Sequence, residues 1–499
     1  MSHKPASQTI YLPEKGKDKR ALMREMDAAR DQDVHWREGR VFSLVFDGGE
    51  DVHQVAEAAY MKFFSENALN PTAFPSLRKF ESEVVAMTAS LLGGDAEVVG
   101  NMTSGGTESL LMTMLTAREW ARTAHPEITQ PEVVLPATAH PAFDKAAHYF
   151  HMKLVRTPVR GDFRADVGAM ARAITPNTVM LVGSAPSYPQ GVVDPIAEIA
   201  ALARERGLLC HVDACVGGMM LPFVERLGRP IPAWDFRTPG VTSISVDLHK
   251  YGYAAKGASV ILYRNKALRR HQLFATTDWS GGIYASPTMA GTRPGGVIAA
   301  AWAVMNYLGE EGYLTRARAV MQARDEIKAG VEAIPDLKIL GDPDISVMAI
   351  ASDDLDVYLV ADEMAVRGWH LDRQQFPPSL HMTLHYGHRA IANAFLRDLR
   401  ASVEAVRRPT PRRFIQRLLV ALVSFLAHVL PEQWMSWLTG QSSRFLSGGG
   451  GLPERSAPMY GIMGALPNRG DLKEIVLDLV EGFSEPEQIE IGLARRRQR

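Results

Sequence analysis

Short apolar runs alternate with helix-like segments between Glu132 and Arg264, and this alternation limits the possible folds. The runs are short enough for single strands and rich in Val, Ile and Leu, and they cover 132–139, 153–159, 178–185, 208–214, 243–247 and 259–263. Such runs, separated by helical segments, are typical of a mainly parallel sheet covered by helices on both faces. The sequence therefore predicts an α/β fold.

Polar residues that could bear chemistry stand directly after several of these runs. They are His140, Ser184, Asp213, His249 and Lys250. Ligands of open α/β sheets collect at the carboxyl ends of the strands. We therefore expect these side chains to lie near one another at one edge of the sheet.

The stretch 243–262 holds the most unusual charge pattern in the chain. Two apolar runs enclose a polar loop with Asp247, His249, Lys250 and Lys256. Burying an ammonium group between apolar strands is costly, so Lys250 is expected either to turn to water or to be held for a reaction. The loop alone fits a solvated turn as well as a reactive site.

A glycine-containing loop at 101–109 reads N-M-T-S-G-G-T-E-S and precedes a predicted helix at 110–122. Gly105 and Gly106 let the backbone approach a ligand closely, Thr107 offers a hydroxyl, and the helix start supplies free N–H groups. This arrangement suits a phosphate, although a capped turn would look the same. The chain lacks a G-x-G-x-x-G motif and a Walker lysine, which disfavours dinucleotides and nucleoside triphosphates.

These residues together match what pyridoxal 5'-phosphate requires. The 101–109 loop would hold the phosphate, His140 would lie against the ring, and Asp213 would keep the pyridine nitrogen protonated. Lys250 would form a Schiff base with the cofactor aldehyde. The sequence predicts this cofactor and no metal site.

Composition and charge limit the class of protein, its binding partners and its compartment. Apolar residues make up 46% and charged residues 22% of the chain, as in ordinary globular proteins, and the net charge of -1 gives no reason to expect nucleic acid. Cys210 and Cys215 cannot form a disulfide framework, which favours a reducing compartment. The basic N-terminus lacks the apolar core of a signal peptide. We expect a cytoplasmic protein, with peripheral membrane association as an open alternative.

The region 407–440 is the source of that alternative. Arginines precede an apolar run at 418–430 that is too short to span a bilayer, and Trp434 and Trp437 follow it. Basic residues beside an apolar helix with tryptophans suit a membrane interface. A helix packed on the protein or at a dimer contact would give the same pattern.

A set of motifs, taken in order, resembles the pyridoxal-phosphate lyases that cleave sphingosine 1-phosphate, within the fold-type I enzymes that include group II amino-acid decarboxylases. The matching segments include N-P-T-A-F-P-S-L-R-K-F-E, T-S-G-G-T-E-S, H-P-A-F-D-K-A-A, H-V-D-A-C-V-G-G, D-L-H-K-Y-G-Y-A-A-K-G and D-W-S-G-G-I-Y-A-S-P-T-M-A-G-T-R-P-G. The likeness covers most of the chain, from about Gly39 to Gln374 and again at A-P-M-Y-G-I-M-G-A.

The resemblance implies a role for each matching residue. The implied cofactor-binding residues are Gly105, Gly106, Thr107, His140, Ser184, Asp213, His249 and Lys250. The implied catalytic residues are Lys250, His249 and Lys256, and the substrate-binding residues are Asn70, Lys256 and Tyr284. The segment G-T-R-P-G at 291–295 resembles one that reaches a neighbouring subunit, which implies a homodimer with shared active sites.

The implied reaction is a retro-aldol cleavage of sphingosine 1-phosphate, or a related phosphorylated long-chain base, to a long-chain aldehyde and phosphoethanolamine. Lys250, His249 and an ordered water remain candidates for the base. The main alternative is a pyridoxal-phosphate-dependent amino-acid decarboxylase. A binding or scaffolding protein that kept the fold and lost catalysis is a further one, because fold alone does not imply function.

Some positions depart from the family pattern. Leu248 and Ala255 replace Thr and Pro, and Asn70 stands where the family commonly has His. Asn70 can still accept or donate a hydrogen bond but carries no positive charge, so this departure bears on substrate preference rather than on the chemistry.

We expect three parts of the chain. Residues 1–95 form a helical segment and dimer-contact arm, 96–335 a large cofactor-binding domain, and 336–499 a smaller C-terminal domain with the apolar insertion at 407–440. Helices are predicted over 22–66, with a break at Gly48 and Gly49, and from Phe80 onward, because Pro71 and Pro75 keep the link before it from being helical. The C-terminal part is predicted to have strands near 346–352 and 381–385 and helices at 354–367 and 388–407.

Overall fold

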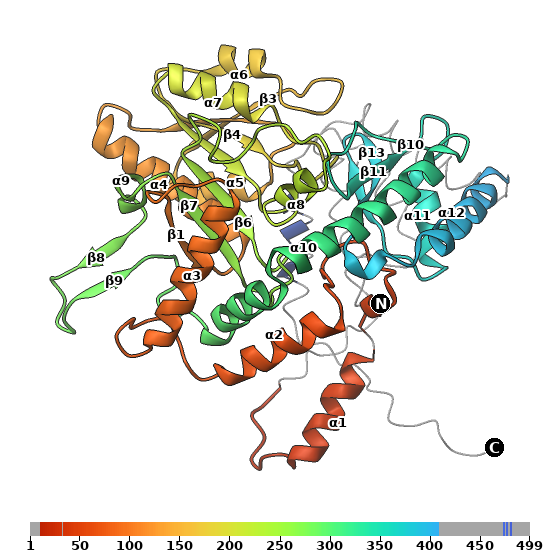
Figure 1. Ribbon diagram of the computed structural model, residues 1–499, viewed down its shortest axis with the longest axis horizontal. Coiled ribbons are helices and arrows are strands. Elements are labelled where there is room, and N and C mark those ends of the chain that lie inside the picture. Colours follow the sequence, from red (N-terminus) through yellow and green to blue (C-terminus); the bar gives the residue numbers. More distant parts are fainter. Residues whose placement is uncertain (1–9, 32, 409–472, 475, 478–479, 482–499) are drawn as a thin grey trace, which may run out of the picture.

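The computed structural model describes residues 10–31, 33–408, 473–474, 476–477 and 480–481. Its centre is a seven-stranded sheet with the order β1-β7-β6-β5-β4-β2-β3 (Figure 1). The strands are β1 (Val99–Thr103), β2 (Glu132–Pro136), β3 (Lys153–Thr157), β4 (Thr178–Ser184), β5 (Leu209–Asp213), β6 (Ser243–Asp247) and β7 (Ser259–Tyr263). The predicted α/β sheet is confirmed.

The sheet is parallel from β3 across to β6, and β7 runs antiparallel to both β6 and β1. All the predicted strands from 132 to 263 are present. Strand β1 is an addition, because V-G-N-M-T carries too few apolar residues to stand out in the sequence. Strand β1 pairs with β7, which lies more than 150 residues later in the sequence, and a local sequence pattern does not reveal such a contact.

Helices bury both faces of this sheet. They are α3 (Pro75–Leu91), α4 (Gly106–Ala124), α5 (Ala142–Phe150), α6 (Val167–Ala173), α7 (Ile196–Glu205), α8 (Leu221–Arg226) and α9 (Lys266–Arg270). Successive residues of a strand point to opposite faces. Val133 accordingly joins a core cluster with Phe143 of α5, and Val134 joins a different cluster with Ile199 of α7. This double burial explains why the central strands β2 and β4 are mostly apolar.

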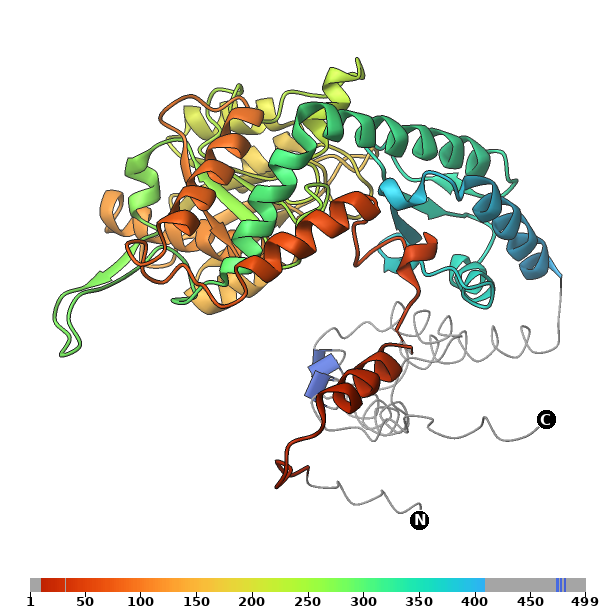
Figure 2. The ribbon, with the colours of Figure 1, turned by 60° about the horizontal axis from the view of Figure 1, so that its bottom comes forward.

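A second, four-stranded sheet lies beside the first, in the order β10-β11-β13-β12 (Figure 2). Its strands are β10 (Lys338–Ile339), β11 (Val347–Ala351), β12 (Asp372–Gln375) and β13 (Pro378–Thr383), and α11 (Val357–Ala365) and α12 (Ala392–Arg407) accompany it. The long helix α10 (Gly295–Glu332) connects the two sheets, with non-helical dihedrals at Gly309. The predicted strands and helices of this part are confirmed, and β10 and β12 are additions.

The helical prediction for 22–66 is wrong in its middle. Helix α1 (Lys19–Arg30) and α2 (Glu50–Lys62) are present, but only the short 3₁₀ turn η1 (Trp36–Glu38) lies between them. Phe42 is fully buried there and stacks on His388 at 4.6 Å, and Val41 bridges to His370. Contacts with the second sheet therefore override the local helical pattern.

The expected start of α3 is also wrong. The helix begins at Pro75 rather than near Phe80. Proline is well tolerated at the first helical position, where its missing N–H would have no partner in the helix. Pro75 therefore starts the helix that it was expected to prevent.

Strands β8 (Phe274–Thr276) and β9 (Tyr284–Ser286) form a hairpin that projects away from the central sheet (Figures 1 and 2). No helix within the described residues is long and apolar enough to cross a membrane. Most of the predicted 407–440 insertion, and the A-P-M-Y-G-I-M-G-A motif, lie outside the described residues. The division into domains at 95 and 335 stays a prediction.

Candidate active site

Lys250 sits in the turn that follows β6, next to the last residue of that strand, Asp247. Its Nζ lies 2.9 Å from Asp247 Oδ2, and the Asp247 side chain is only 2% exposed. Burial alone would lower the pKa of Lys250, but the charge of Asp247 outweighs it and raises the pKa. Burial would likewise raise the pKa of Asp247, yet Lys250 and His249 hold it below its usual value. The loop therefore holds a buried ion pair rather than a solvated turn.

Asp247 also closes one wall of the site against Gly106. A Cβ at Gly106 would lie 2.8 and 2.9 Å from the two carboxylate oxygens and 3.0 Å from Cys215 Sγ. The Oδ1 atom of Asp247 is buried without a hydrogen-bond partner. A bare backbone at position 106 is thus required, and an unpaired acceptor faces the start of α4.

The predicted phosphate loop joins β1 to α4 as expected. Gly105 has φ +151°, a conformation that favours glycine, and α4 begins at Gly106, so its first N–H groups have no partner within the helix. The space above Gly105 is bounded by His249, whose Cε1 would be 3.4 Å from an added Cβ. Glycine backbone, a helix N-terminus and an imidazole therefore meet at one point, next to Thr107.

The proton position on His249 follows from its backbone contact. Its Nδ1 accepts a hydrogen bond from the N–H of Ala258 at 3.2 Å. An accepting Nδ1 leaves the proton of the neutral ring on Nε2. His249 Nε2 is then a donor, and it lies 3.6 Å from Asp247 Oδ2. Burial lowers the pKa of His249, and the Asp247 charge partly offsets this.

Asp213 ends β5 at the same edge of the sheet. Strand register pairs it with Ser184 on β4 and with Ser245 on β6. Its Oδ1 accepts from the N–H of Cys215 at 3.1 Å. The structure thus brings Ser184, Asp213 and Lys250 together, as the strand-end argument predicts.

His140 stands between β2 and α5 within electrostatic range of Asp213, Asp247 and Lys250. Its Nδ1 accepts from the N–H of Ala142 at 3.1 Å, which fixes the ring, and the residue remains exposed. An exposed, anchored imidazole beside a strand-end carboxylate is suited to lie against a planar ligand.

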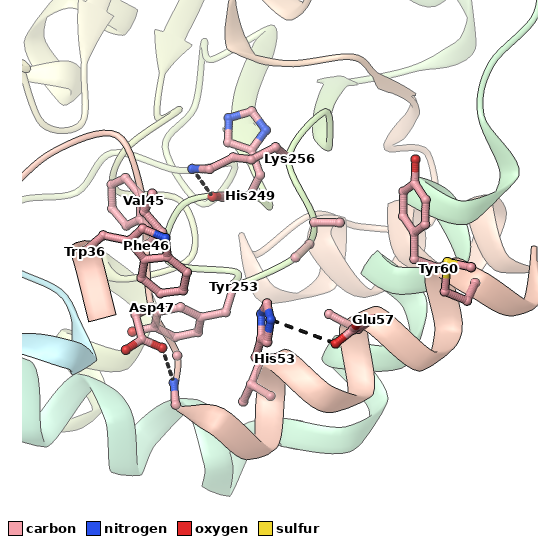
Figure 3. A pocket seen from close by; sticks show the side chains of 17 residues that line it. Trp36, Val45, Phe46, Asp47, His53, Glu57, Tyr60, His249, Tyr253 and Lys256 are labelled. Atoms are coloured by element: carbon pink, nitrogen blue, oxygen red, sulfur yellow. Dashed lines mark hydrogen bonds and ion pairs between the residues drawn. The ribbon is translucent and has the colours of Figure 1, made fainter. Parts of the chain in front are cut away.

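Lys256 lines a cavity of about 260 Å³ between the loop that follows β6 and helix α2 (Figure 3). Its Nζ donates to the carbonyl oxygen of His249 at 3.3 Å and lies 5.4 Å from the Phe46 ring centre. Burial and the charge of Lys250 lower the pKa of Lys256 to about 8. Aromatic side chains line the cavity, among them Trp36, Phe46, Tyr60 and Tyr253.

Asn70 and Tyr284 lie elsewhere on the same chain. Asn70 is exposed and its Oδ1 accepts from the N–H of Thr72 at 2.9 Å. Ala68, two residues before Asn70, donates its N–H to the carbonyl of Arg293 at 2.9 Å, and the Tyr284 hydroxyl would be 2.9 Å from a Cβ at Gly291. The loop that carries Asn70 and the hairpin strand that carries Tyr284 thus both lie close to the 291–293 segment, and neither residue lines the cavity beside Lys256.

The sequence-based reasoning missed the groups behind Asp213. Ser245 Oγ lies 3.4 Å from Asp213 Oδ1 and 3.3 Å from His211 Nε2, and all three residues are buried. Asp247 was noted in the loop but given no role. A detectable signal was present: polar residues at alternate positions 243, 245 and 247 of an apolar strand share one face of the sheet.

The residues present fit pyridoxal 5'-phosphate. Gly105, Gly106 and the start of α4 form a cradle that a Cβ would fill, and the amine of Lys250, paired with Asp247, lies beside it. Asp213 and His140 lie on the remaining sides, where a pyridine nitrogen and a ring face would be bound. The donor set contains what this cofactor needs.

Comparison with known proteins agrees with this geometry. The sequence profile of the pyridoxal-dependent decarboxylase conserved domain matches residues 7–351. A sphingosine-1-phosphate lyase of Arabidopsis thaliana is 42% identical over 489 residues, which are 96% of this chain and 82% of that protein. Sphingosine-1-phosphate lyase 1 of Rattus norvegicus is 45% identical over 398 residues, covering 79% and 70% of the two chains.

Solved structures give the same result. A sphingosine-1-phosphate lyase from Burkholderia pseudomallei superposes with a TM-score of 0.78 and 42% identity, covering 83% of this chain and 96% of that one. A glutamate decarboxylase from Lactobacillus brevis reaches 0.71 at 18% identity, covering 81% and 96%, which is a likeness of fold alone. Pyridoxal 5'-phosphate is the cofactor that the matched domain and the site both indicate. The chain therefore belongs to the sphingosine-1-phosphate lyase family, within the larger group of pyridoxal-dependent decarboxylase domains.

Proposed function

We propose that the chain is a pyridoxal-phosphate-dependent carbon–carbon lyase. Its substrate is sphingosine 1-phosphate or a related phosphorylated long-chain base, and its products are a long-chain aldehyde and phosphoethanolamine. The observation that carries this proposal is the half-buried Lys250 amine among Asp247, Asp213 and the Gly105–Gly106 cradle, in a chain 40–45% identical to lyases of that name.

Each residue then has a definable task. Gly105, Gly106, Thr107 and His249 would hold the cofactor phosphate, because the helix N-terminus supplies free N–H groups and His249 Nε2 is a donor. Lys250 would hold the cofactor covalently, His140 would lie against its ring, and Ser184 would border the ring beside Asp213. When bound, the cofactor supplies an electron sink for the bond that breaks.

The proton positions on His249 and Lys250 limit which of them can take the proton from the substrate hydroxyl. His249 accepts from a backbone N–H through Nδ1, so its neutral form carries its proton on Nε2 and has no free nitrogen lone pair there. Lys250 can accept a proton whenever its amine is free and neutral. We therefore favour Lys250 over His249 for taking the hydroxyl proton, with an ordered water as the remaining candidate.

Lys256 and Asn70 would bind the substrate. Lys256 carries a positive charge at neutral pH and lies between the aromatic cavity and His249, where it could meet the substrate phosphate. Asn70 and Tyr284 are not among the residues that line that cavity. In the proposed homodimer both would reach the active site of the partner copy, so the two subunits would share their sites.

The activity is tested with purified protein and sphingosine 1-phosphate, following long-chain aldehyde and carbon dioxide separately. Aldehyde without carbon dioxide, abolished in Lys250→Ala, is the expected result. Carbon dioxide from an amino acid would favour the decarboxylase alternative. Bound cofactor with neither product would refute the substrate assignment.

The shared site is tested by mixing two inactive variants, Lys250→Ala and Tyr284→Ala. If each site combines Lys250 of one subunit with Tyr284 of the other, mixed dimers contain one intact site and activity returns. Failure of the mixture to recover activity, with exchange of subunits verified, would contradict shared sites.

We also propose a reducing compartment, since Cys210 and Cys215 are both buried as free thiols. Peripheral membrane contact through residues 407–440 is tested by liposome association of the full chain and of a chain without them. Unchanged association after the deletion would contradict the membrane role.

A further inference from the structure

Behind the proposed pyridine partner, Asp213, lies a row of buried polar groups that the reaction scheme does not use. Ser243 Oγ lies 2.9 Å from His211 Nδ1, and Ser245 Oγ lies 3.3 Å from His211 Nε2 and 3.4 Å from Asp213 Oδ1. The exposed fraction of His211 and of Ser245 is 0%. Buried polar groups of this kind persist when they are mutually satisfied.

The strand register creates this row. Strand β5 pairs with β6 in parallel, with His211 opposite Ser243 and Asp213 opposite Ser245. Residues two apart on a strand share one face, so the alternating pairs place all these side chains together. Changing the register by one residue would separate them.

The charge of Asp213 fixes the direction of every hydrogen bond in the row. A carboxylate that faces a protonated pyridine nitrogen is ionised and can only accept. Ser245 must then donate its proton to Asp213, which leaves its oxygen to accept from His211 Nε2–H. His211 Nδ1 carries no proton in that case, so it accepts from the hydroxyl of Ser243.

We infer that Ser245, oriented by His211, is a positioning residue that holds the Asp213 carboxylate aimed at the pyridine nitrogen of the cofactor. The N–H of Cys215 donates to the same oxygen, Oδ1, at 3.1 Å. Two donors to one oxygen restrain the carboxylate. Asp213 itself would make the contact with the cofactor, and Ser245 would not touch it.

The surroundings keep His211 neutral, as this scheme requires. Burial lowers the pKa of His211 to about 4, and the charge of Asp213 only partly opposes it. The Phe143 ring of α5 packs against the imidazole at 6.1 Å between ring centres. A neutral imidazole can donate through one nitrogen and accept through the other, which a charged one cannot.

The inference rests on the cofactor of the proposed function and on Asp213 as its pyridine partner, but not on the substrate. The test therefore uses cofactor and protein only. Cofactor-free protein is titrated with pyridoxal 5'-phosphate, and the visible absorption of the complex is recorded as a function of pH.

Ser245→Ala is expected to weaken cofactor binding about tenfold, since it removes a hydrogen bond to a charged group. The variant should also shift the pH dependence of the absorption band, which a purely structural defect would not do. Ser245→Thr keeps the hydroxyl and is expected to retain most of the cofactor affinity and most of the wild-type pH dependence of the absorption band. Ser402→Ala removes another fully buried serine, which bonds to the Asp398 carbonyl, and should change neither.

The proton assignment is tested separately by nitrogen NMR of histidine-labelled protein with the cofactor bound, with the His211 signal identified by its loss in His211→Asn. We expect the proton on Nε2 at pH 7 and at pH 5. A proton on Nδ1, or wild-type affinity and spectrum in a folded Ser245→Ala, would overturn the inference. Unchanged affinity and spectrum in Asp213→Ala would instead refute the Asp213 assignment of the proposed function.

Discussion

The amine of Lys250 lies 2.9 Å from the carboxylate of Asp247, three residues earlier in the same turn. This pair satisfies a buried ammonium in the cofactor-free protein. It also raises the pKa of an amine that must be neutral to attack the cofactor aldehyde. Asp247 is thus expected to control how the cofactor is captured.

Asp247→Asn removes the largest influence that raises the pKa of Lys250, so burial then lowers it. The rate of cofactor capture should rise with pH in the wild type and reach its plateau at least about one pH unit lower in the variant. Stopped-flow absorbance measures this rate. Asp353→Asn, which breaks the exposed pair with Lys338, is the control. Identical pH profiles would contradict a role for Asp247.

Gly106→Ala is expected to disrupt the cofactor cradle. The added Cβ would meet both Asp247 oxygens at 2.8 and 2.9 Å, and moving Asp247 would disturb its contact with Lys250. We expect a loss of about 1–3 kcal/mol in unfolding free energy, typical of overpacking, together with weaker cofactor binding. Gly161→Ala, where nothing lies within 4 Å of the added Cβ, is the matched control.

Lys256 predicts a pH effect on substrate binding. Its pKa is lowered to about 8 by burial and by Lys250, so it is charged at pH 7 and largely neutral at pH 9. The KM for a phosphorylated base should therefore rise between pH 7 and pH 9. Lys256→Arg stays charged over this range and should flatten the rise. A wild-type KM independent of pH would exclude Lys256 as the phosphate ligand.

His385 predicts weaker folding in acid. Its Nδ1 accepts from the N–H groups of Asp47 and Gly387, and burial lowers its pKa to about 3. Because the folded pKa is below the unfolded value of about 6.5, the stabilisation is present above pH 6.5 and is lost as pH falls toward 3. Because of His385, the free energy of unfolding should fall by about 2 kcal/mol between pH 6.5 and pH 5.

His385→Asn retains an acceptor but does not titrate, so it should remove that part of the pH dependence. Urea unfolding of cofactor-free protein at pH 6.5 and at pH 5 measures the change in the free energy of unfolding. The exposed His148, replaced by Asn, is the control. An equal loss of stability in wild type and His385→Asn would show that His385 is protonated in the folded state.

The projecting hairpin predicts a dimer contact. Trp279 is 58% exposed and Ile283 is 80% exposed at its tip, and large exposed apolar groups favour association. The double variant Trp279→Ser, Ile283→Ser should weaken the dimer with little effect on the fold of the monomer. Light scattering across a concentration series measures the mass. Val366→Ser, at a residue 53% exposed at the C-terminal end of α11, should leave the mass unchanged.

The strands from 132 to 263 were predictable because each contains a short run with Val, Ile or Leu, most of these runs are separated by helix-like segments, and polar residues follow several of them. For the same reason, Asp213 and Lys250 could be placed at one sheet edge before any coordinates. A local pattern determines the type of an element because side-chain periodicity depends only on neighbouring residues.

Tertiary packing decided the rest. Residues 39–49 are not helical because Phe42 packs on His388, and β1 is a strand because β7 offers it hydrogen bonds. The contact of Ser245 with Asp213 joins residues 32 positions apart. Such relationships arise when distant segments pack together, so the sequence by itself determined the elements and the reactive residues, and only the folded chain decided which of them meet.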